Sequence, residues 1–175
     1  MKGARNVEDY EYRLQNTGKH AKKHIEIVHL RTWSAWLALE IPHTTHNALV
    51  ASITHDGRPY IRKADKLKDA ESRIVAALEH ALRNQRRAKE RRLGDTGAAL
   101  SVQVTWCFED KTARKTQVGK PYTKKPDMSN MLKTLEDCLV EVGVIEDDRL
   151  IAKESLRKAY DLHEGILVTV EEFRV

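Results

Sequence analysis

A chain of 175 residues, with 41% apolar and 33% charged residues, suits one ordinary core under a heavily charged surface. Lys and Arg outnumber Asp and Glu by 31 to 26, so the placement of the basic residues matters more than the modest excess. No apolar run approaches the roughly 20 residues that span a bilayer, and Cys107 and Cys138 have neither disulfide-framework nor metal-ligand spacing. We expect a reduced cytoplasmic protein with no export signal, in which residues 1–34 form an extension and residues 35–175 form the domain.

Strands are predicted first along the chain. Period-two alternation over residues 36–41 predicts a strand that Pro42 stops, because proline cannot donate to a sheet. The turn residues at Asp56 and Gly57 then predict a hairpin between two short strands, residues 49–54 and 60–62.

Helical spacing dominates the next part of the chain. Apolar residues recur every three or four positions from residue 64 to about residue 92 and predict a helix that Gly94 ends. A second helix is predicted over residues 129–142. Alternation predicts three further strands, at residues 99–108, 149–153 and 166–173. The order β-β-β-α-β-α-β-β indicates an α+β fold with two main helices packed on one mixed β-sheet.

Acidic residues flank the second predicted helix. Asp127 lies where a loop meets the helix N-terminus, and three acids follow the helix, at Glu146, Asp147 and Asp148. They return beside Asp127 only if the next strand pairs back along the sheet. Converging carboxylates would suit Mg²⁺, which activates water and neutralises charge on a phosphodiester, and Lys133 on the same helix could contact the phosphate. These residues alone favour a structural interpretation, because Asp127 and Ser129 are good helix caps.

The combined pattern resembles the signature of the RusA family. A run Pro-Asp-x-x-Asn-x-x-Lys is followed by Asp137 and then by the Glu-Asp-Asp triplet. The resemblance implies metal binding by Asp127 and Asp148, catalytic roles for these two and Lys133, and further candidate ligands at Ser129, Glu146 and Asp147. The resemblance covers about residues 36–173 and includes Ile41, Pro42 and Asn47 near its start.

Members of this family are small, dimeric, Mg²⁺-dependent endonucleases, often phage-encoded, that resolve four-way (Holliday) DNA junctions. The resemblance therefore implies a homodimer that acts on branched DNA in recombination and repair, without a membrane partner, in a bacterial or phage-infected cell. It implies Mg²⁺ as the cofactor, with Mn²⁺ as a substitute. A two-fold protein would present two metal sites to the symmetric strands of a junction, giving paired symmetric nicks.

One position departs from the family pattern. The second aspartate of the motif, two residues after the first, is Ser129 here, so the site has one carboxylate fewer. Three outcomes stay open. Asp127 and Asp148 suffice with Ser129 binding weakly or through water, or another acid substitutes, with Glu146 facing the same way as Asp148 if that segment is extended. Otherwise catalysis is reduced or lost, which leaves a junction-binding protein.

Basic residues precede the motif. The loop over residues 111–125 contains no acid and leads into Asp127, so it is predicted to bind DNA phosphates. Tyr122 is a candidate for stacking on an exposed base. The predicted DNA-binding residues are Arg114, Lys115, Lys120, Lys124, Lys125 and, from the motif, Asn130.

Other features have plainer interpretations. The basic end of the first helix suits either solvent or DNA, and a zinc site at His43 and His46 is disfavoured because no cysteine lies nearby. Trp33 and Trp36 are interpreted as core or dimer contacts. The leading hypothesis is a metal-dependent endonuclease. The alternatives are a catalytically weak junction binder and a basic protein whose partner is RNA or another protein.

Overall fold

A computed structural model describes residues 28–43, 48–85 and 92–174, and the account below is confined to these ranges. The order of the main elements is the one predicted from the sequence. The elements are β1 (Val28–Leu37), β2 (Leu49–Ile53), β3 (Pro59–Lys63), α1 (Asp65–Asn84), β4 (Ala99–Glu109), α2 (Met128–Glu141), the 3-10 helix η1 (Asp148–Leu150), β5 (Ile151–Asp161) and β6 (Gly165–Arg174).

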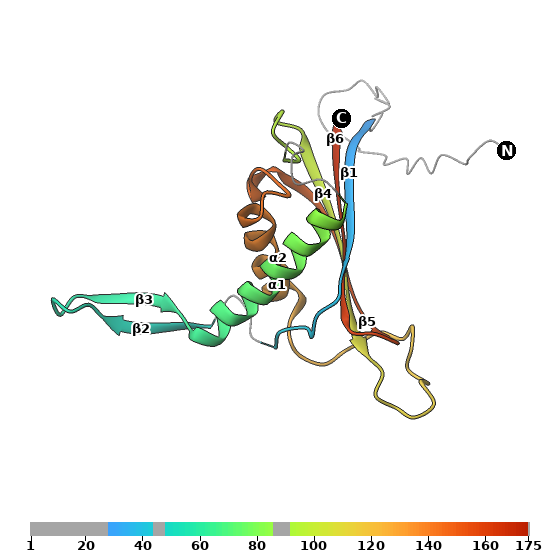
Figure 1. The fold of residues 1–175 in the computed structure, drawn as a ribbon, viewed down its shortest axis with the longest axis horizontal. Coiled ribbons are helices and arrows are strands. Elements are labelled where there is room, and N and C mark those ends of the chain that lie inside the picture. Colours follow the sequence, from blue (N-terminus) through green and yellow to red (C-terminus); the bar gives the residue numbers. More distant parts are fainter. Residues whose placement is uncertain (1–27, 44–47, 86–91, 175) are drawn as a thin grey trace, which may run out of the picture.

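The main sheet has four strands in the order β1-β6-β4-β5. Strands β4 and β5 are parallel and the other neighbours are antiparallel, so the sheet is mixed. Both helices pack on one face of it, and none of the described helices lies on the opposite face (Figure 1). The core lies between sheet and helices, with Trp106, Leu135 and Leu139 among its fully buried side chains. The predicted α+β class is therefore confirmed.

Strand β1 begins earlier than predicted. It starts at Val28 rather than at residue 36, so the main sheet includes residues that the sequence analysis assigned to the extension. Trp33 is buried in the core, as one of its two interpretations required. Trp36 is 43% exposed and lies opposite Leu167 of β6, which is 45% exposed. These two side chains form an exposed apolar pair on the open face of the sheet.

The hairpin of β2 and β3 is a separate two-stranded sheet. The prediction of one mixed sheet is therefore wrong for these two strands. The hairpin projects from the body as an arm (Figure 1). Gly57 has φ +80°, which suits glycine and allows the tight turn at the tip. One face of the arm is apolar, with Ile53 and Ile61 largely exposed.

Two element ends differ from their predicted positions. Helix α1 ends at Asn84, and the remainder of the predicted helix falls mostly on residues 86–91, which lie outside the described ranges. After α2 the chain turns at Gly143 and passes through η1 before β5 begins at Ile151, two residues later than predicted, and β5 continues to Asp161, eight residues beyond its predicted end. Within the described part of the chain, no helix combines the length and apolar character that crossing a membrane requires.

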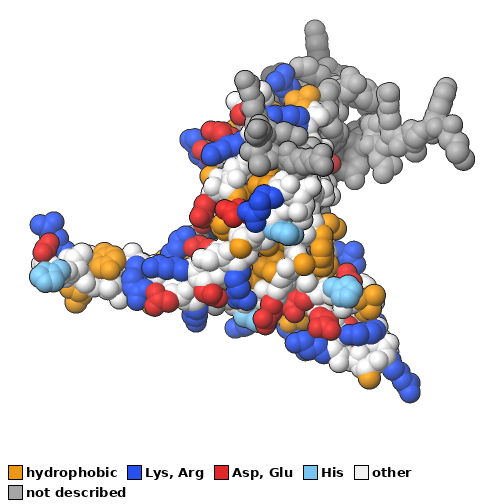
Figure 2. Space-filling view, viewed as in Figure 1, with side chains coloured by type: hydrophobic (Ala, Val, Ile, Leu, Met, Phe, Trp, Pro, Cys, Tyr) orange, Lys and Arg blue, Asp and Glu red, His pale blue; other side chains and the backbone are white. Residues whose placement is uncertain are grey.

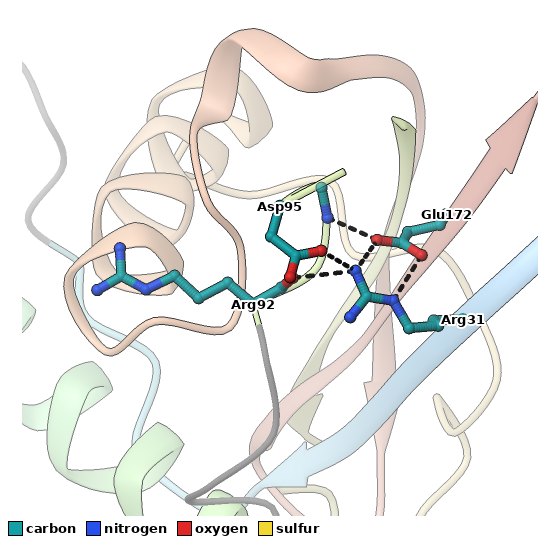
Figure 3. Close-up of polar contacts among 5 residues, drawn as sticks. Arg31, Arg92, Asp95 and Glu172 are labelled. Carbon is teal, nitrogen blue, oxygen red and sulfur yellow. Dashed lines mark hydrogen bonds and ion pairs between the residues drawn. The ribbon is translucent and has the colours of Figure 1, made fainter. Parts of the chain in front are cut away.

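An ion-pair network joins the ends of three segments (Figure 3). Glu172 of β6 is only 1% exposed, and it accepts hydrogen bonds from the Arg31 guanidinium at 2.7 Å and from the Gly94 backbone N–H at 2.7 Å. Arg31 also contacts Asp95 and the Arg92 carbonyl. The bond from Arg31 lowers the pKa of Glu172, so this carboxylate stays charged in the folded protein. The network ties β1 and β6 to the turn that precedes β4.

Candidate active site

Asp127 occupies the position immediately before α2, as the sequence predicted. Its backbone is extended, its carbonyl accepts from Met131 N–H at 3.2 Å, and its exposed side chain makes no capping hydrogen bond. The segment before it is held by Lys158 of β5, whose ammonium donates to the carbonyls of Lys124 at 2.6 Å and Pro126 at 2.8 Å. Strand β5 therefore fixes the start of α2 and leaves the Asp127 carboxylate exposed.

Lys133 and Asp148 meet across the turn that follows α2. The Lys133 ammonium contacts the Asp148 carboxylate and lies 3.1 Å from Asp137 Oδ1, one helical turn farther along. Asp148 reaches this place because β5, which follows it, runs parallel to β4 and returns the chain beside α2. The hydrogen bond from Lys133 to Asp148 raises the pKa of Lys133 most, and the hydrogen bond to Asp137 raises it further. The Lys133 side chain is therefore a cation at neutral pH.

The neighbours of Asp148 point elsewhere. Asp147 accepts from the backbone N–H and the guanidinium of Arg149, which lower its pKa to about 2. Glu146 is exposed and lies 3.8 Å from Arg92. The idea that Glu146 shares the side of Asp148 required an extended segment, but Asp148 begins a 3-10 helix. The structure thus groups neither Glu146 nor Asp147 with Lys133.

Ser129 and Asn130 lie in the first turn of α2. Ser129 is exposed, and the carbonyl of the partly buried Asn130 accepts from Thr134 Oγ at 3.2 Å. Both residues are on the part of the helix that leads to Lys133, the next turn along. The motif residues from Asp127 to Lys133 therefore all lie at or just before the N-terminal half of α2.

Glu136 is a site neighbour that the sequence analysis missed. It is 7% exposed, on α2 one turn beyond Lys133. Burial raises its pKa to about 7, with further increases from the negative charges of Glu154, Asp148 and Asp137 and an opposing effect from Lys133. The signal for it was present in the sequence, since Glu136 interrupts the apolar face formed by Leu132, Leu135 and Leu139.

The residue types at this site fit a hard divalent cation. Within the described ranges, no three acidic, histidine or cysteine side chains are arranged so that they could hold a metal ion. The side chains of Asp137 and Asp148 instead contact the Lys133 ammonium, and Glu136 is buried beside them. Carboxylate oxygens are the ligands that Mg²⁺ takes. The group fits such an ion in its chemistry, provided that these side chains rearrange around it.

The basic loop between β4 and α2 runs along the end of β5. Backbone hydrogen bonds join Tyr122 N–H to the Lys158 carbonyl at 3.0 Å and Gly119 N–H to the Tyr160 carbonyl at 2.9 Å. Figure 2 shows basic side chains on this loop and on the β2–β3 arm. The exposed basic residues of the loop are Lys111, Arg114, Lys115, Lys120, Lys124 and Lys125. Of these, Lys115 is 3.3 Å from Glu109.

Tyr122, the candidate for stacking on a base, has one face of its ring covered within the protein. Tyr122 stacks on Phe108, with ring centroids 3.7 Å apart and planes 9° from parallel. Tyr160 approaches the ring edge-on, and the Lys158 ammonium is 5.6 Å from its centroid. Tyr122 therefore anchors the loop to the sheet through its contact with Phe108.

Three other predictions have partial outcomes. The basic end of the first predicted helix falls mostly on residues 86–91, outside the described ranges, whereas Arg83 is exposed and 3.5 Å from Glu79. His46 also lies outside them, so the zinc interpretation is not tested. Both cysteines are free and buried, in agreement with the absence of a disulfide framework.

Comparison with known proteins agrees with the motif. The family described as Endodeoxyribonuclease RusA matches residues 51–171, which run from within β2 to within β6 and contain every residue of the candidate site. A search of curated proteins found no match. The fold has the mixed sheet and the two helices that the resemblance implied. The chain belongs to the RusA family of endodeoxyribonucleases.

Proposed function

We propose that this protein is a divalent-metal-dependent endonuclease that resolves four-way DNA junctions by paired symmetric nicks. The observation that carries the proposal is the contact of Lys133 with Asp148, fifteen residues apart, which joins the motif on α2 to the later aspartate. Family membership supplies the nuclease class. The substrate, the ion and the residue roles below are part of the proposal.

Asp127 and Asp148 are the proposed ligands of Mg²⁺, for which Mn²⁺ would substitute. When bound, such an ion lowers the pKa of a water and neutralises charge on the phosphodiester. Lys133 remains protonated because its carboxylate neighbours raise its pKa, so it acts as a cation at the phosphate and not as a general base. When Asp148 turns toward the ion, Asp137 continues to hold the Lys133 ammonium in place.

The loop over residues 111–125 is the proposed phosphate-binding surface. It connects β4 directly to Asp127, and its basic side chains are exposed on a backbone that β5 fixes. Phosphate contacts of this type give salt-dependent affinity without reading base sequence. Asn130, in the first turn of α2, would contact the same strand. Selection of branched DNA would then depend on the shape of the junction.

A homodimer is the proposed assembly, because a two-fold protein matches two symmetric cleavage sites. The face of the main sheet that bears the exposed pair Trp36 and Leu167 is the proposed place for a second copy. DNA in a bacterial or phage-infected cell is the proposed setting of the reaction.

A catalytically weak junction-binding protein is the second candidate. Ser129 favours it, because this exposed hydroxyl stands where the family pattern has a carboxylate and cannot supply its charge to an ion. Both candidates share the fold and the basic loop. They differ in cleavage, not in binding.

Incubation of the protein with a labelled four-way junction and Mg²⁺ or Mn²⁺ separates the two. Symmetric paired nicks that Asp148→Asn abolishes support the enzyme, whereas tight junction binding without cleavage in either metal supports the second candidate. Asp69→Asn on the exposed face of α1 is the matched control and should cleave like the native protein. Equal affinity for the junction and for linear duplex would contradict both.

A further inference from the structure

Glu136 has the burial of a core residue and the chemistry of a ligand. Glu136 is only 7% exposed, and within the described ranges its carboxylate makes no hydrogen bond or ion pair. A carboxylate with so little access to water and no hydrogen-bonding partner destabilises a fold. Such a group at a candidate site indicates a function that offsets its cost.

The surroundings of Glu136 point to a cation as its partner. Glu136 follows Lys133 by three residues, which places the two side chains as neighbours on the helix. Asp137 is adjacent in sequence, Asp148 contacts Lys133, and Glu154 of β5 acts on Glu136 electrostatically. Glu136 thus has three acidic neighbours, Asp137, Asp148 and Glu154, and the Lys133 ammonium beside it. A divalent ion would relieve the repulsion that remains.

The position of Glu136 on α2 relates it to Ser129. The two residues are seven apart, so they lie on the same side of the helix, about 10 Å apart along its axis at 1.5 Å per residue. Helical side chains lean toward the N-terminus, so the long Glu136 side chain leans toward Lys133 and Ser129. Glu136 therefore carries, two turns farther along the same face, the negative charge that Ser129 lacks.

We propose that Glu136 is a carboxylate ligand of the divalent ion, compensating on the same face of α2 for the carboxylate that Ser129 lacks. This inference rests on the proposed function, because it concerns the same ion. Asp148 and Glu136 then hold the ion between η1 and α2, and Asp137 keeps Lys133. The alternative substitute, Glu146, is directed to Arg92 and is not needed.

Metal binding measured without DNA tests the inference directly. Titration of Mn²⁺ at pH 8 by calorimetry should give a dissociation constant at least tenfold weaker for Glu136→Gln than for the native protein. The double variant Ser129→Asp, Glu136→Gln should regain most of that loss, because a carboxylate returns to the same face. Glu141→Gln, an exposed glutamate five residues along α2, is the matched control and should bind Mn²⁺ like the native protein.

The results that would overturn the role of Glu136 differ from those that would overturn the proposed endonuclease. Mn²⁺ binding by Glu136→Gln within twofold of the native value overturns the inference, whether or not junctions are cleaved. Native protein that binds Mn²⁺ in a Glu136-dependent way but cleaves no junction overturns the proposed enzyme and leaves the ligand assignment standing. If Glu136→Gln proves unfolded by circular dichroism, Glu136→Asp, which keeps the charge but shortens the side chain, should still weaken Mn²⁺ binding.

Discussion

Replacing Glu136 by glutamine should stabilise the metal-free protein above neutral pH. Burial, aided by nearby carboxylates, raises the pKa of Glu136 from 4.5 to about 7, so the folded state retains a proton that the unfolded chain has lost. Folding stability then falls as the pH rises from about 4.5 to about 7 and is constant above that, because the folded state binds more protons over this range. Glutamine has the shape of the protonated acid and does not titrate.

The size of the effect follows from the pKa difference. Each pKa unit corresponds to about 1.4 kcal/mol, so the rise gives the native protein a loss of about 3 kcal/mol in unfolding free energy between pH 4.5 and pH 8. Glu136→Gln should lack this loss, and its advantage over the native protein should grow from near zero to about 3 kcal/mol across that range.

Urea unfolding in EDTA at a series of pH values measures the difference. Glu141→Gln removes an exposed carboxylate from the same helix and should change stability by less than about 0.5 kcal/mol at every pH. Parallel stability curves for the native protein and Glu136→Gln would refute the reasoning, since they would show that the carboxylate has the same pKa folded and unfolded. Saturating Mn²⁺ should stabilise the native protein more than the variant.

Three further predictions concern the other contacts. Lys133→Met should reduce junction cleavage about 100-fold or more in a single-turnover assay and leave junction affinity nearly unchanged; equal losses in both would contradict its role at the phosphate. The double change Arg114→Ala, Lys120→Ala should lower the slope of log affinity against log salt by about 2 in a titration of junction binding, whereas Lys68→Ala on α1 should leave it unchanged. Arg31→Met should cost about 3 kcal/mol in urea unfolding at pH 7, because it leaves the Glu172 carboxylate buried without its cation. The cost should fall as the pH drops through the range in which the Glu172 carboxyl group becomes protonated, and a constant cost would show that charge is not the cause.

Local sequence patterns were sufficient for the elements but not for all their ends. Period-two and 3.6-residue spacing predicted β4, β6 and α2 to within about two residues, because each has one buried face. The start of β1 was missed because Arg31 interrupts the apolar alternation, and only its pairing with Glu172, far along the chain, explains a charge at that position. The separate β2–β3 arm was likewise not predictable, since strand propensity does not specify which strands pair.

The sequence by itself determined which residues belong to the candidate site: Asp127, Ser129 and Lys133 at one helix, and Asp148 after it. Tertiary structure decided which of these groups meet. Parallel pairing of β5 with β4 brings Asp148 to Lys133, the local turn directs Asp147 to Arg149, and Tyr122 stacks on Phe108. Burial of Glu136 beside these acids also depends on the packing of α2 against the sheet. Spacing along a chain fixes which residues share a helix face, whereas contacts between elements depend on how the sheet assembles.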